Sequence, residues 1–427
     1  MSRPQLLYLV HRVPFPPNRG DRIRSYHFLR FLSERYDVSL ATLADEPVAD
    51  SARRELDQFC VQVAIEPLGR SRWLRAAASL ASGGSATVGL FESPALRKTV
   101  RRWAGERRFD AALVFCSSMV QYRNCPELDG VPTVIDLVDV DSQKWFDYAA
   151  KARGLRRQLF RLEGRRLRRL ECSLPTQAQA ITLVSEAEAS LYRSFCPNER
   201  TTAILMGVDL DYFRPQNSGS SPWQSLSKQD RCQLVFVGAL DYRANIDAVA
   251  WFAAEVWPLA RQRLPNLSLA LVGRNPAPAV QRLANLPGIR VFADVPDVRP
   301  HVAAADLVVA PLRIARGIQN KVLEAMAMGK PVVTSPAALE GLAAEPGRHL
   351  LVADEPSQWT EVVAELLHDD ELALSLGMSA RRFVERSHAW QSTLEPLARL
   401  ISHASEASTR PEHTSPTAVS VSLAAAS

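Results

Sequence analysis

Residues 310–334 of the chain have the sequence APLRIARGIQNKVLEAMAMGKPVVT. The first letters end an apolar run, Leu307–Ala310, at a proline, and Gly317 then allows a tight turn. Small and apolar residues with the spacing of a helix follow, and another apolar run begins at Val332. This succession predicts one unit of a parallel α/β sheet, in which a helix connects two strands.

The helix of this unit carries Lys321 and Glu324, three residues apart and therefore on one face. A helix N-terminus behind a glycine turn presents free backbone N–H groups and a positive dipole end to a phosphate, and Lys321 adds a full charge. Glu324 lies one turn further along, where a carboxylate can accept hydrogen bonds from a ribose diol. A solvent-exposed ion pair between the two side chains is the alternative that this spacing leaves open.

The alternation of short apolar runs and amphipathic helices occurs twice, which predicts two parallel sheets covered by helices. We expect a first domain at 1–205 and a second at 206–384, with a loop rich in Ser and Pro at 216–230 near the junction. A helix at 385–403 is expected to pack back on the first domain, and 404–427 to form a disordered tail. The expected strands are Leu6–Val10, Val38–Leu43, Ala111–Phe115, Thr133–Leu137, Ala180–Val184, Leu234–Val237, Leu267–Val272, Ile289–Phe292, Leu307–Ala310, Val332–Thr334 and Leu350–Val352.

The 427 residues and the apolar share of 47% are typical of a globular protein with two domains. They exclude a peptide hormone, a single-module binder and a globally disordered chain. The six cysteines are widely spaced, without the pairs that a zinc site or disulfide framework requires, so we expect a reducing, cytoplasmic compartment. Leu6–Val10 is too short for a signal peptide. No stretch approaches the roughly 20 apolar residues of a membrane-spanning helix, so we expect any membrane association to be peripheral.

Positive charge is concentrated in one segment. The whole chain has 51 Lys and Arg against 46 Asp and Glu, yet residues 151–170 contain nine basic residues and one acid, Glu163. This stripe suggests phospholipid headgroups or nucleic acid as partner, and a solvated helix face is the alternative. Phe160 is the only interleaved aromatic residue, so we expect no nucleic-acid partner. An anionic membrane surface held through Arg153–Arg169 is the partner that we consider.

The opening stretch resembles the C-terminal signature of family 4 glycosyltransferases, which have the GT-B fold and an E-x7-E segment before a small-residue helix ending in G-[KR]-PVV. Leu7–Leu43, Val134–Trp145, Phe236–Phe252 and Ala310–Leu342 are most similar to the sugar transferases associated with exosortase and PEP-CTERM exopolysaccharide systems. The resemblance implies an α/β protein with two facing Rossmann-like domains. It also implies a nucleotide-diphosphate sugar held mainly by the second domain, retention of anomeric configuration, and no metal or other cofactor.

One departure from the family pattern lies before Glu324. Eight residues earlier the family has a glutamate associated with the donor sugar, whereas this chain has Arg316. Arg316 can meet the diphosphate or an acidic sugar, or point to solvent. The resemblance keeps Glu324 as the ligand of the nucleotide ribose.

A second departure follows the strand Leu234–Val237. Many family members have a glycine and then an arginine here, with a lysine several residues later, and the pair neutralises the departing diphosphate. In this chain Ala239 follows Gly238. Arg243 in the same loop is the expected substitute, with Asn245 as a polar donor or helix cap. An arginine in solvent is the alternative.

Candidate residues in the first half follow two strands of the predicted sheet. Gly20 and Arg24 belong to the loop and helix start after Leu6–Val10, at the carboxyl edge where open α/β folds place their sites. The resemblance implies that this loop faces the donor phosphates. Asp136, Asp139 and Asp141 end or follow the strand Thr133–Leu137, where a carboxylate can orient an acceptor hydroxyl, bind a metal or cap a helix.

The expected function is that of a cytoplasmic glycosyltransferase, peripheral at the inner membrane face, that moves a sugar from a nucleotide-diphosphate donor to a saccharide or polyprenyl-linked acceptor in exopolysaccharide or envelope glycan synthesis. The alternatives are a nucleotide-sugar epimerase on the same fold and a non-catalytic sugar-nucleotide-binding partner of a polysaccharide assembly complex. Three residues are expected to act in catalysis and eight in substrate binding, with no metal ligand. The catalytic candidates are Lys321, Arg243 and Asp139, and the binding candidates are Gly20, Arg24, Gly238, Asn245, Arg316, Gly317, Ile318 and Glu324.

Overall fold

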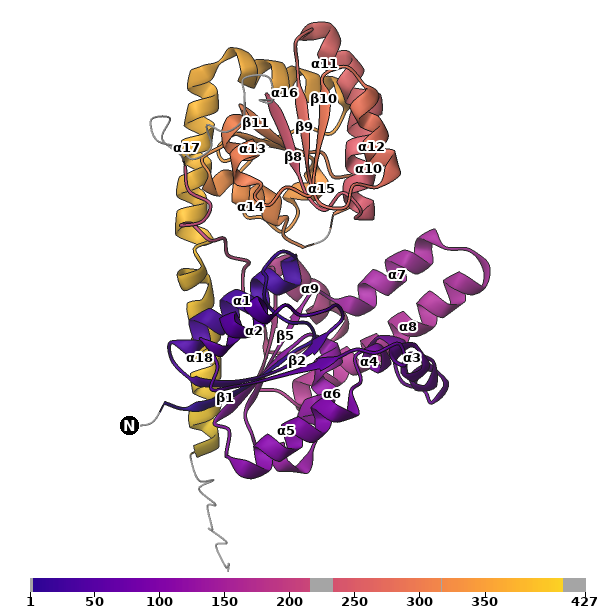
Figure 1. Cartoon of the computed structure of the whole chain (residues 1–427), viewed down its shortest axis with the longest axis vertical. Coiled ribbons are helices and arrows are strands. Elements are labelled where there is room, and N and C mark those ends of the chain that lie inside the picture. The colour runs from indigo at the N-terminus through magenta and orange to yellow at the C-terminus, as the bar shows by residue number, and fades with distance from the viewer. Residues whose placement is uncertain (1–2, 216–232, 316, 410–427) are drawn as a thin grey trace, which may run out of the picture.

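The computed structural model describes residues 3–215, 233–315 and 317–409. Two sheets with helices around them lie one above the other in Figure 1. Every pairing between neighbouring strands is parallel, as expected for strands joined by helical crossovers. The α/β class with two Rossmann-like domains is thereby confirmed.

The first sheet has seven strands in the order β3-β2-β1-β4-β5-β6-β7. Alternate residues of its central strand enter two separate apolar clusters: Leu6 and Tyr8 lie in one, Leu7 and Leu9 in the other. The sheet is therefore buried on both faces, which is why its central strands are almost continuously apolar. The strands are β1 (Gln5–Val10), β2 (Asp37–Ala44), β3 (Gln62–Pro67), β4 (Ala111–Phe115), β5 (Thr133–Val138), β6 (Ala180–Leu183) and β7 (Thr201–Ala203).

Helices connect these strands, and one pair of them stands apart. In Figure 1, α7 and α8 form a hairpin that projects from the first domain. Gly164 of α8 allows the two helices to approach, because a Cβ there would lie 3.0 Å from the Phe146 ring of α7. The helices are α1 (Gly20–Ser33), α2 (Asp50–Asp57), α3 (Arg72–Ala81), α4 (Ala86–Leu90), α5 (Pro94–Glu106), α6 (Val120–Arg123), α7 (Asp141–Lys151), α8 (Gly154–Ser173) and α9 (Glu186–Phe195).

The second sheet has six strands in the order β10-β9-β8-β11-β12-β13. Its strands are β8 (Leu234–Val237), β9 (Leu269–Gly273), β10 (Ile289–Ala293), β11 (Leu307–Ala310), β12 (Val332–Thr334) and β13 (Leu351–Val352). Its helices are α10 (Arg243–Trp251), α11 (Trp257–Arg263), α12 (Pro278–Gln281), α13 (Arg299–Ala304), α14 (Asn320–Ala327), α15 (Pro336–Leu339), α16 (Pro356–His368) and α17 (Asp370–Ser387).

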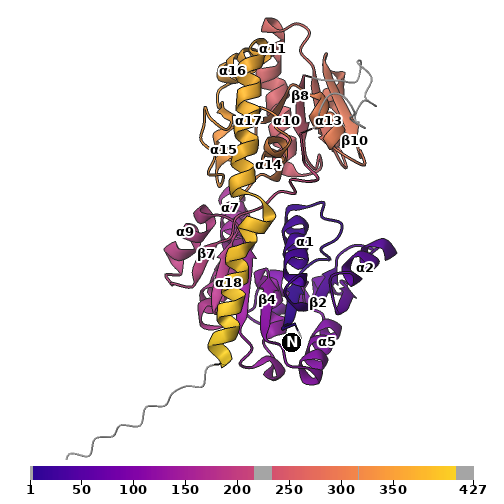
Figure 2. The same cartoon turned by 90° about the vertical axis from the view of Figure 1, so that its left-hand side faces the viewer.

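The last helix, α18 (Trp390–Thr409), returns the chain to the first domain. In Figure 2, α17 and α18 run end to end along one side of both domains. Trp390 stacks on His27 of α1 at 4.5 Å between ring centroids. Gly207 makes room for the indole, since a Cβ there would lie 2.4 Å from the Trp390 ring. The helix continues through Thr409, so the expectation that a disordered tail begins at 404 is wrong for its first residues; residues 410–427 lie outside the described ones.

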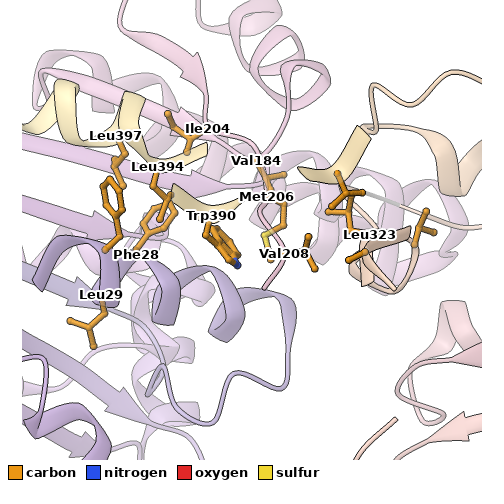
Figure 3. Packing of buried hydrophobic residues seen from close by; sticks show 14 of the residues in the cluster. Phe28, Leu29, Val184, Ile204, Met206, Val208, Leu323, Trp390, Leu394 and Leu397 are labelled. Carbon is orange, nitrogen blue, oxygen red and sulfur yellow. The ribbon is translucent and has the colours of Figure 1, made fainter. Parts of the chain in front are cut away.

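The apolar core is continuous between the two domains. Met206, Val208 and Trp390 lie between side chains of the first domain, such as Phe28, and Leu323 of α14 in the second (Figure 3). The hydrogen bond between His388 Nδ1 and the Met206 carbonyl oxygen, 2.7 Å long, joins the two chain segments that cross here. Helix α14 is thus anchored from behind, while its N-terminus faces the other domain.

Sequence patterns missed two edge strands, β3 and β7. β3 contains Glu66 and ends in Pro67, and its residues are mostly half-buried. β7 has three residues. Neither segment has the longer apolar run that marked the other strands. No helix among the described residues has both the length and the apolar character needed to cross a membrane.

Candidate functional site

The end of β8 and the start of α14 form a polar cradle. Lys321 Nζ donates to Asn245 Oδ1 at 2.6 Å, and Asn245 Nδ2 donates to the Ala239 carbonyl oxygen at 2.8 Å. A Cβ on Gly238 would lie 2.8 Å from Asn245 Nδ2 and 3.2 Å from Lys321 Nζ. Glycine at this position therefore allows the amide and the ammonium group to sit against the backbone. The structure brings together three candidate residues, Gly238, Asn245 and Lys321.

Burial shapes the charge of Lys321 and Glu324. The Lys321 ammonium lies 4.5 Å from the centroid of the Phe236 ring. Burial lowers the pKa of Lys321 to about 7 and raises the pKa of Glu324 to about 7, and the charge of each partner opposes these shifts. Neither side chain is exposed, and Lys321 is directed to Asn245, so the alternative of a solvent-exposed pair is wrong. An incoming anion would favour the charged form of Lys321. No sequence pattern predicted the contact between Lys321 and Phe236.

The glycine turn before α14 meets the first domain. Gly317 has a φ of 59°, and a Cβ there would lie 2.9 Å from Asp139 Oδ1 and 3.7 Å from Val184 Cγ1. Gly341 lies on the other side of the turn, where a Cβ would be in ordinary contact, 3.6 Å from the Gly317 carbonyl and 3.7 Å from Ile318 Cγ1. The turn is thus held between the two domains, and only glycine fits there without strain.

Two helix starts approach each other across the domain boundary. Gly20 is the first residue of α1, and a Cβ on it would lie 3.6 Å from Nδ2 of Asn320, the first residue of α14. The free N–H groups of both helices therefore lie close to the domain boundary. Together with Gly317, these residues define a candidate site between the carboxyl edges of the two sheets.

Asp139 is the carboxylate of the first domain that faces this site. Its Oδ1 is buried and has no hydrogen-bond partner among the described residues. Burial and the neighbouring carboxylates of Glu188 and Asp141 raise the pKa of Asp139 to about 7. Asp141 instead accepts a hydrogen bond from Ser117 Oγ at 3.2 Å. Asp139 Oδ1 therefore lacks the hydrogen bond that a buried carboxylate oxygen normally has.

Two residues at the same sheet edge have unusual backbone conformations that the sequence did not predict. Cys116 follows β4 with a φ of 73°, and Val138 ends β5 with a φ of 67°. β4 and β5 are neighbours, so both lie beside the Asp139 loop. A β-branched residue in this region is a steric outlier. Such conformations cluster at functional sites because the surrounding structure must hold them in place.

The expected binding role of Arg24 is wrong. Arg24 is 0% exposed, and its Nη2 and Nε donate to the Asp136 carboxylate at 2.6 and 3.2 Å. Asp136 also accepts from Thr182 Oγ1 at 2.6 Å. The ion pair joins α1 to β5 and β6. Because a charge buried in the first domain is stable only with a partner there, Arg24 is not available to a ligand.

The basic loop after β1 is neutralised by acidic residues of its own domain. Arg12 forms ion pairs of 2.8 Å with both Asp21 and Asp45. Arg22 pairs with Glu46 at 2.6 Å. The positive charge that this loop shows in the sequence is therefore largely used within the fold.

Of the two arginines expected near the diphosphate, the structure describes Arg243 and not Arg316. Arg243 is exposed at the first position of α10, and no hydrogen bond or ion pair joins its side chain to another described residue. Its charge is free to meet a ligand or solvent. Arg316 lies outside the described residues. Among the residues that the structure describes, no group of three or more His, Cys, Asp or Glu side chains is placed to hold a metal ion.

Comparison with protein families concerns mainly the second domain. Residues 231–369 match the family model described as glycosyl transferases group 1. The chain is 29% identical over 237 residues to D-inositol 3-phosphate glycosyltransferase of Thermobispora bispora, covering 52% of this chain and 55% of that protein. It is 28% identical over 240 residues to a GDP-mannose-dependent alpha-(1-6)-phosphatidylinositol monomannoside mannosyltransferase of Mycobacterium tuberculosis, covering 51% of this chain and 60% of that protein. The chain thus spans little more than half the length of these curated relatives.

Comparison with solved structures concerns the whole chain. Sucrose-phosphate synthase from Thermosynechococcus elongatus superposes with a TM-score of 0.69 at 15% identity, over 94% of this chain and 100% of the other. HepE from Anabaena in complex with UDP superposes with a TM-score of 0.63 at 16% identity, over 93% and 100%. The fold is the GT-B arrangement of two facing Rossmann-like domains.

Proposed function

We propose that this protein is a glycosyltransferase that moves a sugar from a nucleotide-diphosphate donor to a saccharide or lipid-linked saccharide. One observation carries the proposal: the Gly317 turn, which leads into the helix of Lys321 in the second domain, lies against the unpartnered carboxylate of Asp139 in the first. A cation and a hydroxyl-binding carboxylate on opposite sides of one domain boundary are what glycosyl transfer needs. The match of the second domain to group 1 glycosyl transferases supports the assignment.

The leaving group sets the main chemical demand. As the bond between the anomeric carbon and the phosphate oxygen breaks, negative charge develops on the β-phosphate. Lys321, already held 2.6 Å from Asn245, and the free N–H groups of α14 can stabilise this charge without reorganising. Arg243 is exposed at the start of α10, and its side chain would add a second positive charge. These groups supply the required positive charge, so the proposal includes no metal and no other cofactor.

Glu324 is assigned to the nucleotide itself. It lies one helical turn beyond Lys321 on the same face of α14. A carboxylate accepts hydrogen bonds from both hydroxyl groups of a ribose, so Glu324 would hold the nucleoside while Lys321 holds the diphosphate. Gly20 would allow the diphosphate to approach the start of α1 closely, and Ile318 would cover its other side.

Asp139 is assigned to the acceptor. Its free Oδ1 would accept a hydrogen bond from the attacking hydroxyl group and so fix its orientation. The acceptor oxygen then bonds to the anomeric carbon as the phosphate leaves, and the hydroxyl proton passes to the departing phosphate. We infer attack on the face from which the phosphate leaves, with retention of configuration, from the resemblance to family 4 enzymes.

The names of similar proteins support the substrate classes. HepE was crystallised with UDP, and the mycobacterial relative is named as dependent on GDP-mannose, which supports a nucleotide-diphosphate sugar as donor. The same relative acts, by its name, on a phosphatidylinositol monomannoside, which is a lipid-linked saccharide. We propose a similar acceptor here, used at the cytoplasmic face of the membrane in exopolysaccharide or envelope glycan synthesis of the exosortase-associated type.

A ligand screen tests the donor half of this proposal. The full chain is heated with UDP, GDP, ADP or CDP, or with their common sugars, and unfolding is followed. A ligand present at about 100 times its Kd should raise the free energy of unfolding by roughly 2.7 kcal/mol. We expect one base to be preferred and its sugar to be turned over once an acceptor is added. Stabilisation by none of these ligands would contradict the proposal.

Arg316 motivates one second candidate, a non-catalytic partner that binds a sugar nucleotide. It stands where family 4 enzymes have a glutamate associated with the donor sugar. This candidate predicts binding of the nucleotide-diphosphate sugar without release of the nucleotide under any acceptor condition. Conversion of the donor to its epimer without any acceptor would instead identify an epimerase.

A further inference from the structure

The helical hairpin α7–α8 carries a dense set of free positive charges. Six arginines of this segment are exposed and take part in no ion pair among the described residues. The single acid of the stripe, Glu163, faces inward and accepts hydrogen bonds from Ser85 Oγ and the backbone N–H groups of residues 86 and 87 at 2.6–2.9 Å. No exposed carboxylate therefore interrupts the stripe on α8. The exposed arginines are Arg153, Arg156, Arg157, Arg161, Arg165 and Arg169.

Two arginines of the same stripe have structural roles. Arg166 Nη1 donates to the Leu80 and Gly84 carbonyl oxygens, and the bond to Gly84 is 2.7 Å long. Arg168 donates to Gln143 at 2.9 Å and covers the Phe146 ring. The free charge of the stripe is therefore smaller than its sequence suggests, and it lies on the outward side of α8.

Apolar side chains lie exposed among these arginines. Leu155 is 77% exposed, and Leu159 and Leu162 are also exposed. Their spacing of four and three residues places them on one face of α8. Exposed leucines in a row are unfavourable in water and mark an interaction surface.

Helix α3 adds to this surface. Arg166 bonds directly to the end of α3, and Figure 1 shows α3 beside the hairpin. Trp73 and Leu74 of α3 are 63% and 74% exposed. Arg70, just before the helix, is exposed as well. We call the exposed residues of segments 70–81 and 153–173 together the α3–α8 surface; it combines leucines, one tryptophan and seven free arginines.

We propose that the α3–α8 surface docks on the anionic headgroups of a lipid bilayer and inserts its leucines and Trp73 into the interface. Charge complementarity selects the partner, because arginines bind lipid phosphates while the apolar side chains between them lose contact with water. A nucleic acid would satisfy the arginines but leave the row of leucines exposed. Tryptophan is favoured at the headgroup level of membranes.

The position of the surface has a consequence for the candidate site. Helix α7 begins at Asp141, two residues after Asp139. Ser142 of α7 is tied to α8, since its backbone N–H donates to Glu171 Oε1 at 2.9 Å. The docked hairpin would thus hold the Asp139 loop near the membrane. That a lipid-linked acceptor comes within reach of Asp139 rests on the proposed function. Docking of the α3–α8 surface on a membrane does not rest on it.

Flotation of the full chain with lipid vesicles tests the proposal. We expect binding to vesicles of phosphatidylcholine mixed with phosphatidylglycerol, weak binding to phosphatidylcholine alone, and weakening with salt. Replacing Arg156, Arg157, Arg161 and Arg165 by Gln should lower the partition coefficient at least about 10-fold. Leu155→Gln with Leu159→Gln should lower it at least about 5-fold without changing the charge.

Matched controls separate local from general effects. Replacing Arg54, Lys98, Arg263 and Arg282 by Gln removes the same charge from exposed positions elsewhere, and Leu374→Gln changes a leucine of α17 that is 64% exposed. Both controls should bind vesicles like the unmodified chain. Equal loss in the control and α8 variants, or no vesicle binding by the unmodified chain, would overturn the proposal. If the arginine variant of α8 lost binding to RNA while its binding to vesicles stayed unchanged, the proposal would also be overturned. Nucleotide binding, measured in parallel, should stay intact in every variant, which distinguishes failure of docking from failure of the proposed function.

Discussion

Charge is organised differently on the two sides of the domain boundary. In the second domain, Lys321 is half-buried, bonded to a neutral amide, and has no carboxylate within ion-pair distance among the described residues. In the first domain, Arg12 and Arg22 are paired with acids, and Arg24 is completely buried with Asp136. A count of basic residues therefore overstates the anion-binding capacity of the first domain. Lys321, whose partner is an amide, keeps its positive charge available for a ligand.

The largest expected effect concerns the buried ion pair between Arg24 and Asp136 in the first domain. Arg24→Ala should lower the free energy of unfolding by about 3–5 kcal/mol, because it leaves the Asp136 charge buried without its partner. Urea denaturation at neutral pH measures this change. Arg53→Ala, which removes an exposed pair with Asp57, should cost at most about 1 kcal/mol. Similar small losses for both would show that Arg24 is not the structural ion that we describe; Arg24→Lys serves if the alanine variant does not fold.

A second prediction separates catalysis from stability at Asp139. Asp139→Asn should lower acceptor-dependent turnover about 100-fold, the scale of a lost positioning or proton-handling group, and leave donor binding unchanged. The raised pKa means that the folded state holds a proton between the ordinary pKa and about 7, so its stability falls as pH rises through that window. Asn removes this cost, and the variant should melt at a higher temperature than the parent at pH 8. Unchanged turnover would remove Asp139 from the site.

The cradle itself can be distorted without removing a charge. Gly238→Ala should weaken nucleoside-diphosphate binding by roughly 10-fold, or about 1.4 kcal/mol, because the new Cβ displaces the Asn245 and Lys321 side chains. Stability should change little, since both displaced groups are the ends of side chains. Gly105→Ala is the matched control, because nothing lies within 4 Å of a Cβ at that position. Equal affinity of both variants for the diphosphate would argue against the cradle.

The smallest expected effect is a pH dependence. Burial lowers the pKa of Lys321 to about 7, so a growing fraction of the free protein loses this charge as pH rises above 7. Affinity for a nucleoside diphosphate should therefore fall several-fold between pH 7 and pH 9, by calorimetry. Lys321→Ala should bind weakly with little pH dependence over the same range. A parallel fall in that variant would assign the titration to another group.

Sequence patterns predicted the site residues of the second domain better than those of the first, and the reason is physical. Gly317, Lys321 and Glu324 lie within eight residues, so local spacing alone places them around one helix start. The pairing of Arg24 with Asp136 spans 112 residues and depends on how α1 packs on β5. Local spacing cannot reveal such a contact.

The same reason explains the other differences. The burial of Glu163 could not be predicted from sequence patterns, because it depends on the packing of α8 against the start of α4. The orientation of the Asp139 carboxylate depends on the backbone at the preceding residue, Val138. Its φ of 67° is rare for a β-branched residue, so no sequence pattern predicts it. The central strands, by contrast, were predictable because burial on both faces leaves long apolar runs.

Calorimetric titration of one variant shows whether Lys321 supplies positive charge to a diphosphate site. Lys321→Ala should bind the preferred nucleoside diphosphate about 10- to 100-fold more weakly, the loss of a charge-assisted hydrogen bond, and bind the nucleoside itself as the parent does. Glu324→Ala should weaken both, and Lys98→Ala, an exposed lysine on α5, should change neither. Equal, negligible effects of Lys321→Ala and Glu324→Ala on the diphosphate would contradict the account.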